Sequence, residues 1–421
     1  MRKTTIVKGY FNLFINAVIA GILASLLAIS LKEMTAHVQE SLYELCRKHP
    51  SLFVIFPSVG ITLIYFTRKY LFKGRENKGI KEIFETLKKR KNELPLYKIP
   101  SHYINGFLTV ISGGSTGVEV STVVSTAAIG ANTYKTERAV NAYKTELVCA
   151  GVAAGVATLF CNPIAGMLFA VEAISKKASK TILFSSGIAV LVSWGIIYLS
   201  GSKPLFNFSV TGWYRTALPY MILLSILAGF LAVYFTQTVI RIKSRFAAIR
   251  NNFLRVNTGA VLVGILIFIF PQLYGDSYHA LPELLKHSGS FSVSFLGLLL
   301  LLIFLKPLAA SLTLGAGGDG GVFAPSLVSG AVLGILIAIV CNHFLHTHLI
   351  VLNFALIGAA AMLSAAIHAP MTAVFLACGL TPGGFILFIP ILIGTMLSKA
   401  VAQKLCSYTV YTYPGALISG R

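Results

Sequence analysis

The sequence predicts an all-α integral membrane protein, and three observations support this class. Of the 421 residues, 56% are hydrophobic and only 12% are charged, whereas soluble domains average about 25% charged residues. The mean hydropathy is +0.78. Apolar stretches close to the roughly 20 residues of a spanning helix recur without strand-like alternation, which favours helices over a β-barrel. These stretches lie near residues 10–31, 52–66, 147–174, 182–200, 217–239, 258–271, 293–313, 323–342, 349–379 and 384–402.

Positive charge is concentrated between the apolar stretches. The net charge is +21, and residues 68–98 and 241–255 carry much of it. On a soluble protein this charge would suggest nucleic-acid binding, but in short interhelical segments it determines topology and contacts anionic lipid headgroups. The positive-inside rule places both segments, and the Arg2-Lys3 start, on the cytoplasmic side. No nucleic-acid partner is expected.

The first part of the chain is predicted to contain two spans and a short helix. Residues 1–33 form a first helix, because the apolar run is too long for a signal peptide and no clear cleavage site follows it. Residues 34–51 are a polar connection, and a second span ends near Phe66. Asn77 is a plausible N-cap for a helix with apolar positions from Ile80 onward.

A glycine-rich segment then occurs twice. Residues 112–130 and 316–334 align at a constant offset of 204 with eight identities and no gap, which indicates an internal duplication. We therefore expect two membrane half-repeats, residues 1–204 and 205–421, without a separate soluble domain. The identical pairs are Gly113 and Gly317, Gly114 and Gly318, Gly117 and Gly321, Val118 and Val322, Val124 and Val328, Ser125 and Ser329, Ala127 and Ala331, and Gly130 and Gly334.

Each copy of this segment is a glycine loop that opens a helix, which is a favourable place for an anion. The first amides of a helix have no partner within the helix, and the macrodipole adds partial positive charge there. Irregular backbone in a membrane is tolerated only where protein buries it or where it lines a cavity. Paired broken helices in related halves indicate a binding site near the bilayer midplane. The sequence therefore predicts two half-helices that converge on one anion.

A second landmark is repeated after each loop. Residues 146–174 are predicted to form a helix pair that is broken before Pro163, since proline favours the first helical turn. The second half offers the similar break Ile367-His368-Ala369-Pro370, at an offset of 207. No metal or cofactor is expected, because the six cysteines show no CxxC spacing and the histidines at 343, 346 and 348 lack acidic neighbours.

These residues resemble the CLC chloride channels and proton-coupled chloride transporters. The similarity rests on Gly117-Val118-Glu119, Pro163-Ile164-Ala165-Gly166, the complete Gly-x-Phe-x-Pro element at 321–325 and a late tyrosine. It covers nearly the whole chain. The resemblance implies an inverted repeat of many tilted and broken helices, and a homodimer with one anion pathway per subunit. It also implies a multi-pass location, in a bacterial inner (plasma) membrane.

The resemblance also implies the site residues. Glu119 takes the position of the gating glutamate, whose carboxylate competes with the anion and exchanges protons. A carboxylate that caps its own helix start would occupy the place of an anion, so both interpretations of Glu119 agree. The tyrosine aligns at Tyr411, with Tyr413 as the alternative. The residues implied in anion binding are Gly117, Val118, Val322, Phe323, Tyr411, Lys78 and Gly79.

Three departures from the family pattern leave the mechanism open. Lys78 stands where the family has an anion-coordinating serine, and Lys81 replaces a proline. Lys78 is either an ordinary cytoplasmic charge or a cation that projects into the anion pathway. Val120-Ser121 replaces the glycine and proline after the gating glutamate. The internal proton-relay glutamate aligns with Ala173, one residue past Glu172. Glu172 is either a structural partner for a backbone donor or a displaced proton relay.

The expected function is transport of chloride or a similar small anion, gated by Glu119 and coupled to protons. A passive chloride channel and a fluoride/proton exporter are the alternatives. The channel branch of the family, like this chain at Ala173, lacks the relay glutamate, and the fluoride branch also lacks the anion-coordinating serine. An intramembrane hydrolase that uses Ser115 or Ser121 is disfavoured, since no Gly-x-Ser-x-Gly element is present. We expect no enzymatic activity. Small anions, protons and the lipid bilayer are the expected partners.

Overall fold

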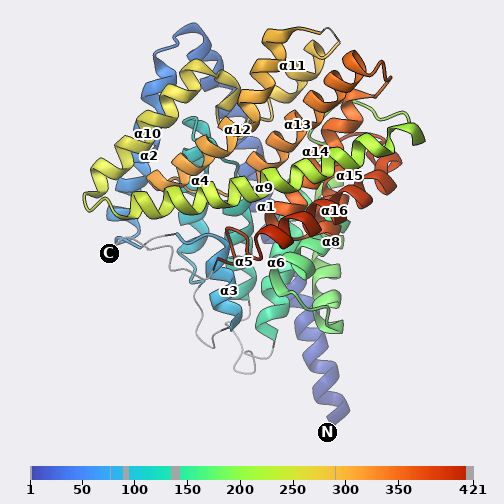
Figure 1. The fold of residues 1–421 in the computed structure, drawn as a ribbon. Helices are drawn as coiled ribbons and strands as arrows, with labels where there is room; N and C mark the ends of the chain where they lie inside the picture. Colours follow the sequence, from blue (N-terminus) through green and yellow to red (C-terminus); the bar gives the residue numbers. More distant parts are fainter. Residues whose placement is uncertain (1, 76, 89–93, 134–142, 290, 414–421) are drawn as a thin grey trace. The chain divides into compact units, whose positions relative to one another are not determined.

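A computed structural model describes residues 2–75, 77–88, 94–133, 143–289 and 291–413 (Figure 1). Within these ranges it contains sixteen α-helices and no strand, which confirms the all-α prediction. Part of the basic segment, positions 89–93, lies outside the described residues. The helices are α1 (Arg2–Lys48), α2 (Leu52–Phe66), α3 (Ile80–Lys88), α4 (Lys98–Ile111), α5 (Glu119–Thr133), α6 (Lys144–Leu159), α7 (Pro163–Leu168), α8 (Lys180–Ser200), α9 (Leu218–Ala247), α10 (Asn252–Ile269), α11 (Ala280–His287), α12 (Val293–Ala316), α13 (Phe323–Phe344), α14 (Val351–Ile367), α15 (Pro370–Gly379) and α16 (Phe388–Leu405).

Eight helical segments in the described ranges are long and apolar enough to cross a membrane. They include all or most of α1, α2, α8, α9, α10, α12, α13 and α16, and three shorter apolar helical segments accompany them. Many of their residues are buried inside the protein. In the most apolar stretch of α13, 83% of the residues are buried. The protein is therefore an integral membrane protein.

The first helix is longer than predicted. Helix α1 continues to Lys48 through most of residues 34–51, so the predicted polar connection is wrong. No glycine or proline occurs from residue 22 to residue 49, and nothing in this stretch breaks a helix. Buried positions also continue along it, including Thr35, Gln39 and Cys46.

The predicted proline breaks are confirmed in both halves. Helix α6 ends at Leu159 and α7 begins at Pro163, where the Asn162 side chain accepts a hydrogen bond of 3.1 Å from the amide of Ala165. Helix α14 ends at Ile367 and α15 begins at Pro370. Each proline occupies the helix start, where its missing N–H leaves no hydrogen bond unmade.

The chain forms two compact units. The first contains residues 1–34, 77–104 and 119–204, and the second contains 35–76, 105–118 and 205–421. One boundary falls at 204/205, where the predicted half-repeats meet. Compact units need not coincide with repeats, so the assignment of half-repeats stays a prediction.

Each unit contains a helix pair that packs backbone against backbone at equivalent glycines. In the first unit a Cβ added at Gly130 of α5 would lie 2.0 Å from the carbonyl oxygen of Leu147 on α6. In the second, a Cβ at Gly334 of α13 would lie 2.0 Å from the carbonyl oxygen of Phe354 on α14, which runs beside it (Figure 1). Only glycine allows this approach. The same contact at repeat-related positions supports an internal duplication.

Candidate anion-binding site

The two glycine loops are hydrogen-bonded to each other's preceding helices within the second unit. We define the first glycine loop as residues 112–118 and the second as residues 317–322. The amide of Ser115 donates to Thr313 Oγ1 at 3.0 Å, and the amide of Asp319 donates to Thr109 Oγ1 at 2.9 Å. The two donors, Ser115 and Asp319, are separated by the repeat offset of 204, and so are the two acceptors, Thr109 and Thr313. The duplicated loops therefore lie side by side and bond reciprocally.

The threonines that accept these amides lie in the last turns of their own helices, α4 and α12. Thr109 Oγ1 donates to the carbonyl of Asn105 at 2.7 Å, and Thr313 Oγ1 donates to that of Ala309 at 2.9 Å. The chain then turns through Gly113 and Gly317, with φ of +91° and +105°. Such left-handed glycines are typical helix C-caps. Each buried hydroxyl therefore fixes one loop and one helix end.

The loops approach each other so closely that one position between them accepts only glycine. A Cβ added at Gly320 would lie 2.4 Å from Thr116 Oγ1 and 3.2 Å from the carbonyl oxygen of Gly117. Gly320 also has a φ of +156°. Gly117 is among the residues implied in anion binding, and the structure places it against the second loop.

Tyr411 reaches the start of the second half-helix. Its hydroxyl oxygen accepts a hydrogen bond of 3.2 Å from the amide of Val322, directly before α13 begins at Phe323. Tyr413 instead packs its ring against Tyr408, with ring centroids 5.0 Å apart. A phenol hydroxyl can accept and donate at once. Of the two alternatives, Tyr411 is therefore the tyrosine that meets a helix start.

Glu119 begins the first half-helix, in the first unit. Helix α5 starts at Glu119, and the residue is only 3% exposed. Its backbone follows directly on Val118, the last residue of the first glycine loop. All positions of α5 from residue 119 to residue 131 are buried. A buried carboxylate is costly unless it is paired or hydrogen-bonded, so its protonation state depends on its surroundings.

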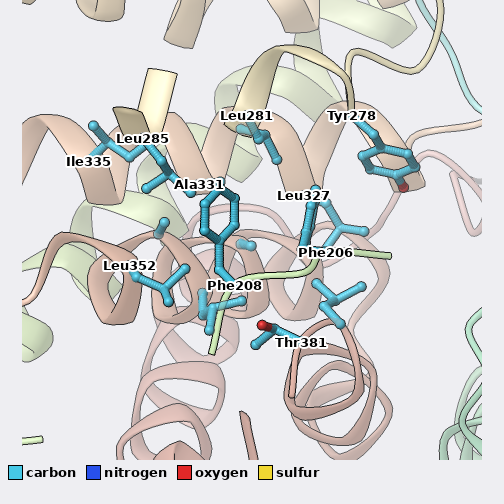
Figure 2. Close-up of a pocket in the computed structure, with 14 residues that line it drawn as sticks. Phe206, Phe208, Tyr278, Leu281, Leu285, Leu327, Ala331, Ile335, Leu352 and Thr381 are labelled. Atoms are coloured by element: carbon cyan, nitrogen blue, oxygen red, sulfur yellow. The ribbon is translucent and has the colours of Figure 1, made fainter. Parts of the chain in front are cut away.

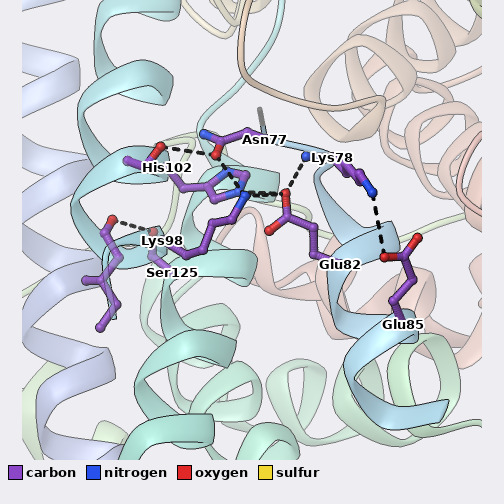
Figure 3. Close-up of polar contacts among 9 residues, drawn as sticks. Asn77, Lys78, Glu82, Glu85, Lys98, His102 and Ser125 are labelled. Carbon is purple, nitrogen blue, oxygen red and sulfur yellow. Dashed lines mark hydrogen bonds and ion pairs between the residues drawn. The ribbon is translucent and has the colours of Figure 1, made fainter. Parts of the chain in front are cut away.

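The segment before α3 is fixed by a buried carboxylate (Figure 3). Glu82 Oε1 accepts from the backbone amide of Lys78 and from Lys98 Nζ at 2.9 Å, and His102 Nε2 lies 3.7 Å away. Burial by itself raises the pKa of Glu82. The hydrogen bond and charge of His102, the charge of Lys98 and the Lys78 amide outweigh burial, so the pKa lies below its ordinary value. Asn77 Oδ1 accepts from Ser101 Oγ at 3.1 Å.

The Lys78 side chain lies toward solvent, while Gly79 lies beside α5. The Lys78 ammonium is 3.8 Å from Glu85 Oε2, and the side chain is 48% exposed. A Cβ added at Gly79 would be 3.5 Å from Val120 Cγ1, next to Glu119 in sequence. Carboxylates therefore engage both the backbone amide and the ammonium of Lys78, and Gly79 lies next to the first turn of α5.

Glu172 lies in a π-helical turn. This turn covers Phe169–Ser175 and follows α7 in the first unit. The residue is half-buried. π-Helical turns within α-helices are rare and occur often at functional sites, which is compatible with a role for Glu172 in proton movement.

Sequence reasoning missed three features of this region. The Thr109 and Thr313 pair could have been found by extending the repeat alignment four residues upstream of Gly113 and Gly317. Lys306 is a lone cation inside an apolar run, which marks a functional candidate in a membrane. The Glu82 cluster gave no signal, because Lys98 and His102 lie far from Glu82 along the chain, 16 residues away in the case of Lys98.

The second unit also contains an apolar pocket (Figure 2). Side chains of α11, α13 and α14 line it together with Phe206 and Phe208. Among the described residues that line it none is charged, and hydroxyl groups come only from Tyr278 and Thr381. A dehydrated anion needs several polar partners. This pocket therefore does not fit the predicted anion site.

Comparison with known proteins agrees with this geometry. The family model described as voltage gated chloride channel matches residues 59–403. The chain belongs to this family. It is 26% identical to the H(+)/Cl(-) exchange transporter ClcA of Salmonella arizonae over 428 residues, covering 96% of this chain and 88% of that protein. Its match to ClcA of Yersinia pestis, at 25% identity, covers 63% of this chain and spans only 56% of that relative's length.

Solved structures show the same fold. The crystal structure of a slow cyanobacterial Cl⁻/H⁺ antiporter superposes with a TM-score of 0.78 at 21% identity, covering 95% of this chain and 96% of that one. A CLC-type fluoride/proton antiporter gives the same TM-score and the same coverage. The predicted CLC-type fold is thereby confirmed.

Proposed function

We propose that this protein exchanges chloride, or a similar small anion, for protons across the membrane. The observation that carries the proposal is the reciprocal bonding of the two glycine loops, together with the Tyr411 hydroxyl at the amide of Val322. The amides of a helix start and a phenol hydroxyl can replace part of the water around an anion. The relatives named as H(+)/Cl(-) exchange transporters support this function.

The anion is held by dipoles and not by a contacting cation. Amides at the start of α13 and the hydroxyl of Tyr411 would donate to it. Transport requires binding that is strong enough to admit the anion and weak enough to release it. Amide and hydroxyl donors meet this requirement better than an ammonium in direct contact would. The exposed position of the Lys78 ammonium is compatible with this arrangement.

Glu119 supplies the gate and the proton. In its charged form the carboxylate accepts hydrogen bonds from the amides at the start of its own helix and so takes the place of an anion. Protonation removes this charge, and the carboxyl group then no longer competes with the anion. Glu172 in the π-helical turn is the proposed internal relay, because the family position holds Ala173. A passive channel is the second candidate, and Ala173 is the observation that favours it.

We propose the same assembly and location as the family has. Two copies of the chain form a homodimer in a bacterial inner membrane, with one anion pathway in each subunit. The basic segments at 68–98 and 241–255 face the cytoplasm, as the positive-inside rule predicts.

Flux from proteoliposomes tests the proposal. An ion-selective electrode records chloride efflux while a pH electrode records proton uptake, for wild type and Glu119→Gln. Wild type should move both ions. Glu119→Gln should stop proton movement and remove the pH dependence of chloride flux, because glutamine cannot exchange a proton. Chloride efflux without proton movement in wild type would favour the channel, and an unchanged pH profile in the variant would refute the role of Glu119.

A further inference from the structure

A lysine is fully buried in the middle of helix α12. Lys306 is only 1% exposed, within an apolar helix that is long enough to cross the membrane. Its ammonium donates to Ser115 Oγ at 2.9 Å, to the carbonyl of Gly275 at 2.8 Å and to Ser277 Oγ at 2.7 Å. A lysine has three donors, and here neutral oxygens accept all three. The three hydrogen bonds place the Lys306 head group directly beside the first glycine loop.

One of these partners belongs to the first glycine loop. Ser115 receives the ammonium on its hydroxyl, donates that hydroxyl to the carbonyl of Leu273 at 2.9 Å, and donates its amide to Thr313 Oγ1. The loop is thus attached to α12 at two points, Lys306 and Thr313. Gly117 and Val118 follow within three residues of Ser115.

The charge of Lys306 acts on the groups around it. Burial, and to a smaller extent the nearby ammonium, lower the pKa of His279 to about 4. The Asp276 carboxyl accepts from Gln39 Nε2 at 3.1 Å and from the amide of Tyr278 at 3.0 Å. Burial raises the pKa of Asp276, while these two bonds and the ammonium lower it by less.

We propose that Lys306 is a positioning and electrostatic residue of the anion pathway. It holds the first glycine loop in place and favours an anion there through its charge, without contacting the anion. This inference rests on the proposed function. A buried ammonium is well suited to this role, because salt screens buried charges far less than exposed ones.

The size of the effect follows from the distance. Ser115 and Val118 are three residues apart, which at 3.8 Å per step limits the ammonium to within about 17 Å of the end of the loop. At an effective dielectric constant of about 20, a unit charge about 17 Å from an anion at the end of the loop changes its affinity about fivefold, and a shorter distance gives a larger effect.

Bromide binding to the purified full-length protein, measured by titration calorimetry at constant ionic strength, tests the inference. Lys306→Met keeps most of the side-chain volume and should weaken bromide binding about fivefold or more. Lys286→Met is the matched control, because it removes an exposed charge from α11 in the same unit. That control should change bromide affinity less than twofold, since solvent and salt screen its charge.

A second pair of variants leaves Lys306 in place and protects the test against misfolding. Ser277 has a φ of +67°, a conformation that asparagine and aspartate both tolerate. Ser277→Asp places a carboxylate against the ammonium, and Ser277→Asn is its neutral isostere. Bromide should bind the aspartate variant several-fold more weakly than the asparagine variant.

The outcomes separate this inference from the function itself. If Lys306→Met folds and binds bromide as tightly as wild type, the role of the Lys306 charge is overturned. If Lys306→Met does not fold, equal bromide affinity of Ser277→Asp and Ser277→Asn overturns it. Such a result would leave the proposed transport untouched. Absence of anion binding to wild type would instead refute the proposed function.

Discussion

The hydroxyl of Thr313 should control the stability of a loop almost 200 residues away in sequence. In Thr313→Val the side chain keeps its shape, but the amide of Ser115 loses the acceptor that lies 3.0 Å away. A buried amide without its acceptor costs about 1–3 kcal/mol. Local opening at this amide should therefore become about 5- to 150-fold more frequent.

Hydrogen exchange measured by mass spectrometry detects this opening. Thr313→Val should speed exchange in peptides that contain Ser115, and Thr109→Val should speed exchange in peptides that contain Asp319. The reciprocity is specific, because each substitution acts across the duplicated loops. Thr238→Val is the control, since this exposed hydroxyl of α9 donates only to the carbonyl of Tyr234 one turn earlier, at 2.8 Å.

Two results would refute this reasoning. Exchange of Ser115 that is unchanged in Thr313→Val would mean that the loops do not bond reciprocally. Faster exchange over the whole of α12 and α13, as in general destabilisation, would mean that the hydroxyl has no specific role at the loop.

Three further predictions concern other contacts. Gly320→Ala should lower the melting temperature and the anion flux, because a Cβ there would lie 2.4 Å from Thr116 Oγ1. The double variant Gly320→Ala, Thr116→Gly should recover part of both. If the losses from the two substitutions simply add, the contact is not the cause. Glu82→Gln should lower the melting temperature at pH 7 and reduce the fall of the melting temperature on acidification. The pKa of Glu82 lies below its ordinary value, so its stabilisation is present at neutral pH and is lost as pH falls through that lowered pKa. Parallel plots of melting temperature against pH for wild type and variant would contradict this. Tyr411→Phe should weaken bromide binding about 2- to 10-fold, the effect of one hydrogen bond, whereas Tyr413→Phe should not; equal effects would remove the distinction.

Local signals in the sequence predicted much of the fold. Pro163 and Pro370 start helices because proline lacks the N–H that a helix interior requires. The glycine loops were found because both copies kept the glycines that the close approach demands. The end of the first helix was misjudged, because polar residues after position 33 resembled a connection although no residue there breaks a helix.

The contacts that assemble the site were not predictable from local patterns. Ser115 and Thr313 are 198 residues apart, and Asp319 and Thr109 are 210 apart. A hydroxyl that bonds over such a separation leaves no periodicity in the sequence. The environment of Lys78 was equally hidden, because Glu82 and Glu85 engage it only once α3 has formed.

Anomalous diffraction from crystals grown in bromide tests the central claim most directly. The Tyr411 hydroxyl and the amides at the start of α13, which directly follows the second glycine loop, should hold one halide within about 3.5 Å. A bromide peak at that position is the expected result. Full bromide occupancy elsewhere in the membrane region, with none at Tyr411, would contradict the claim.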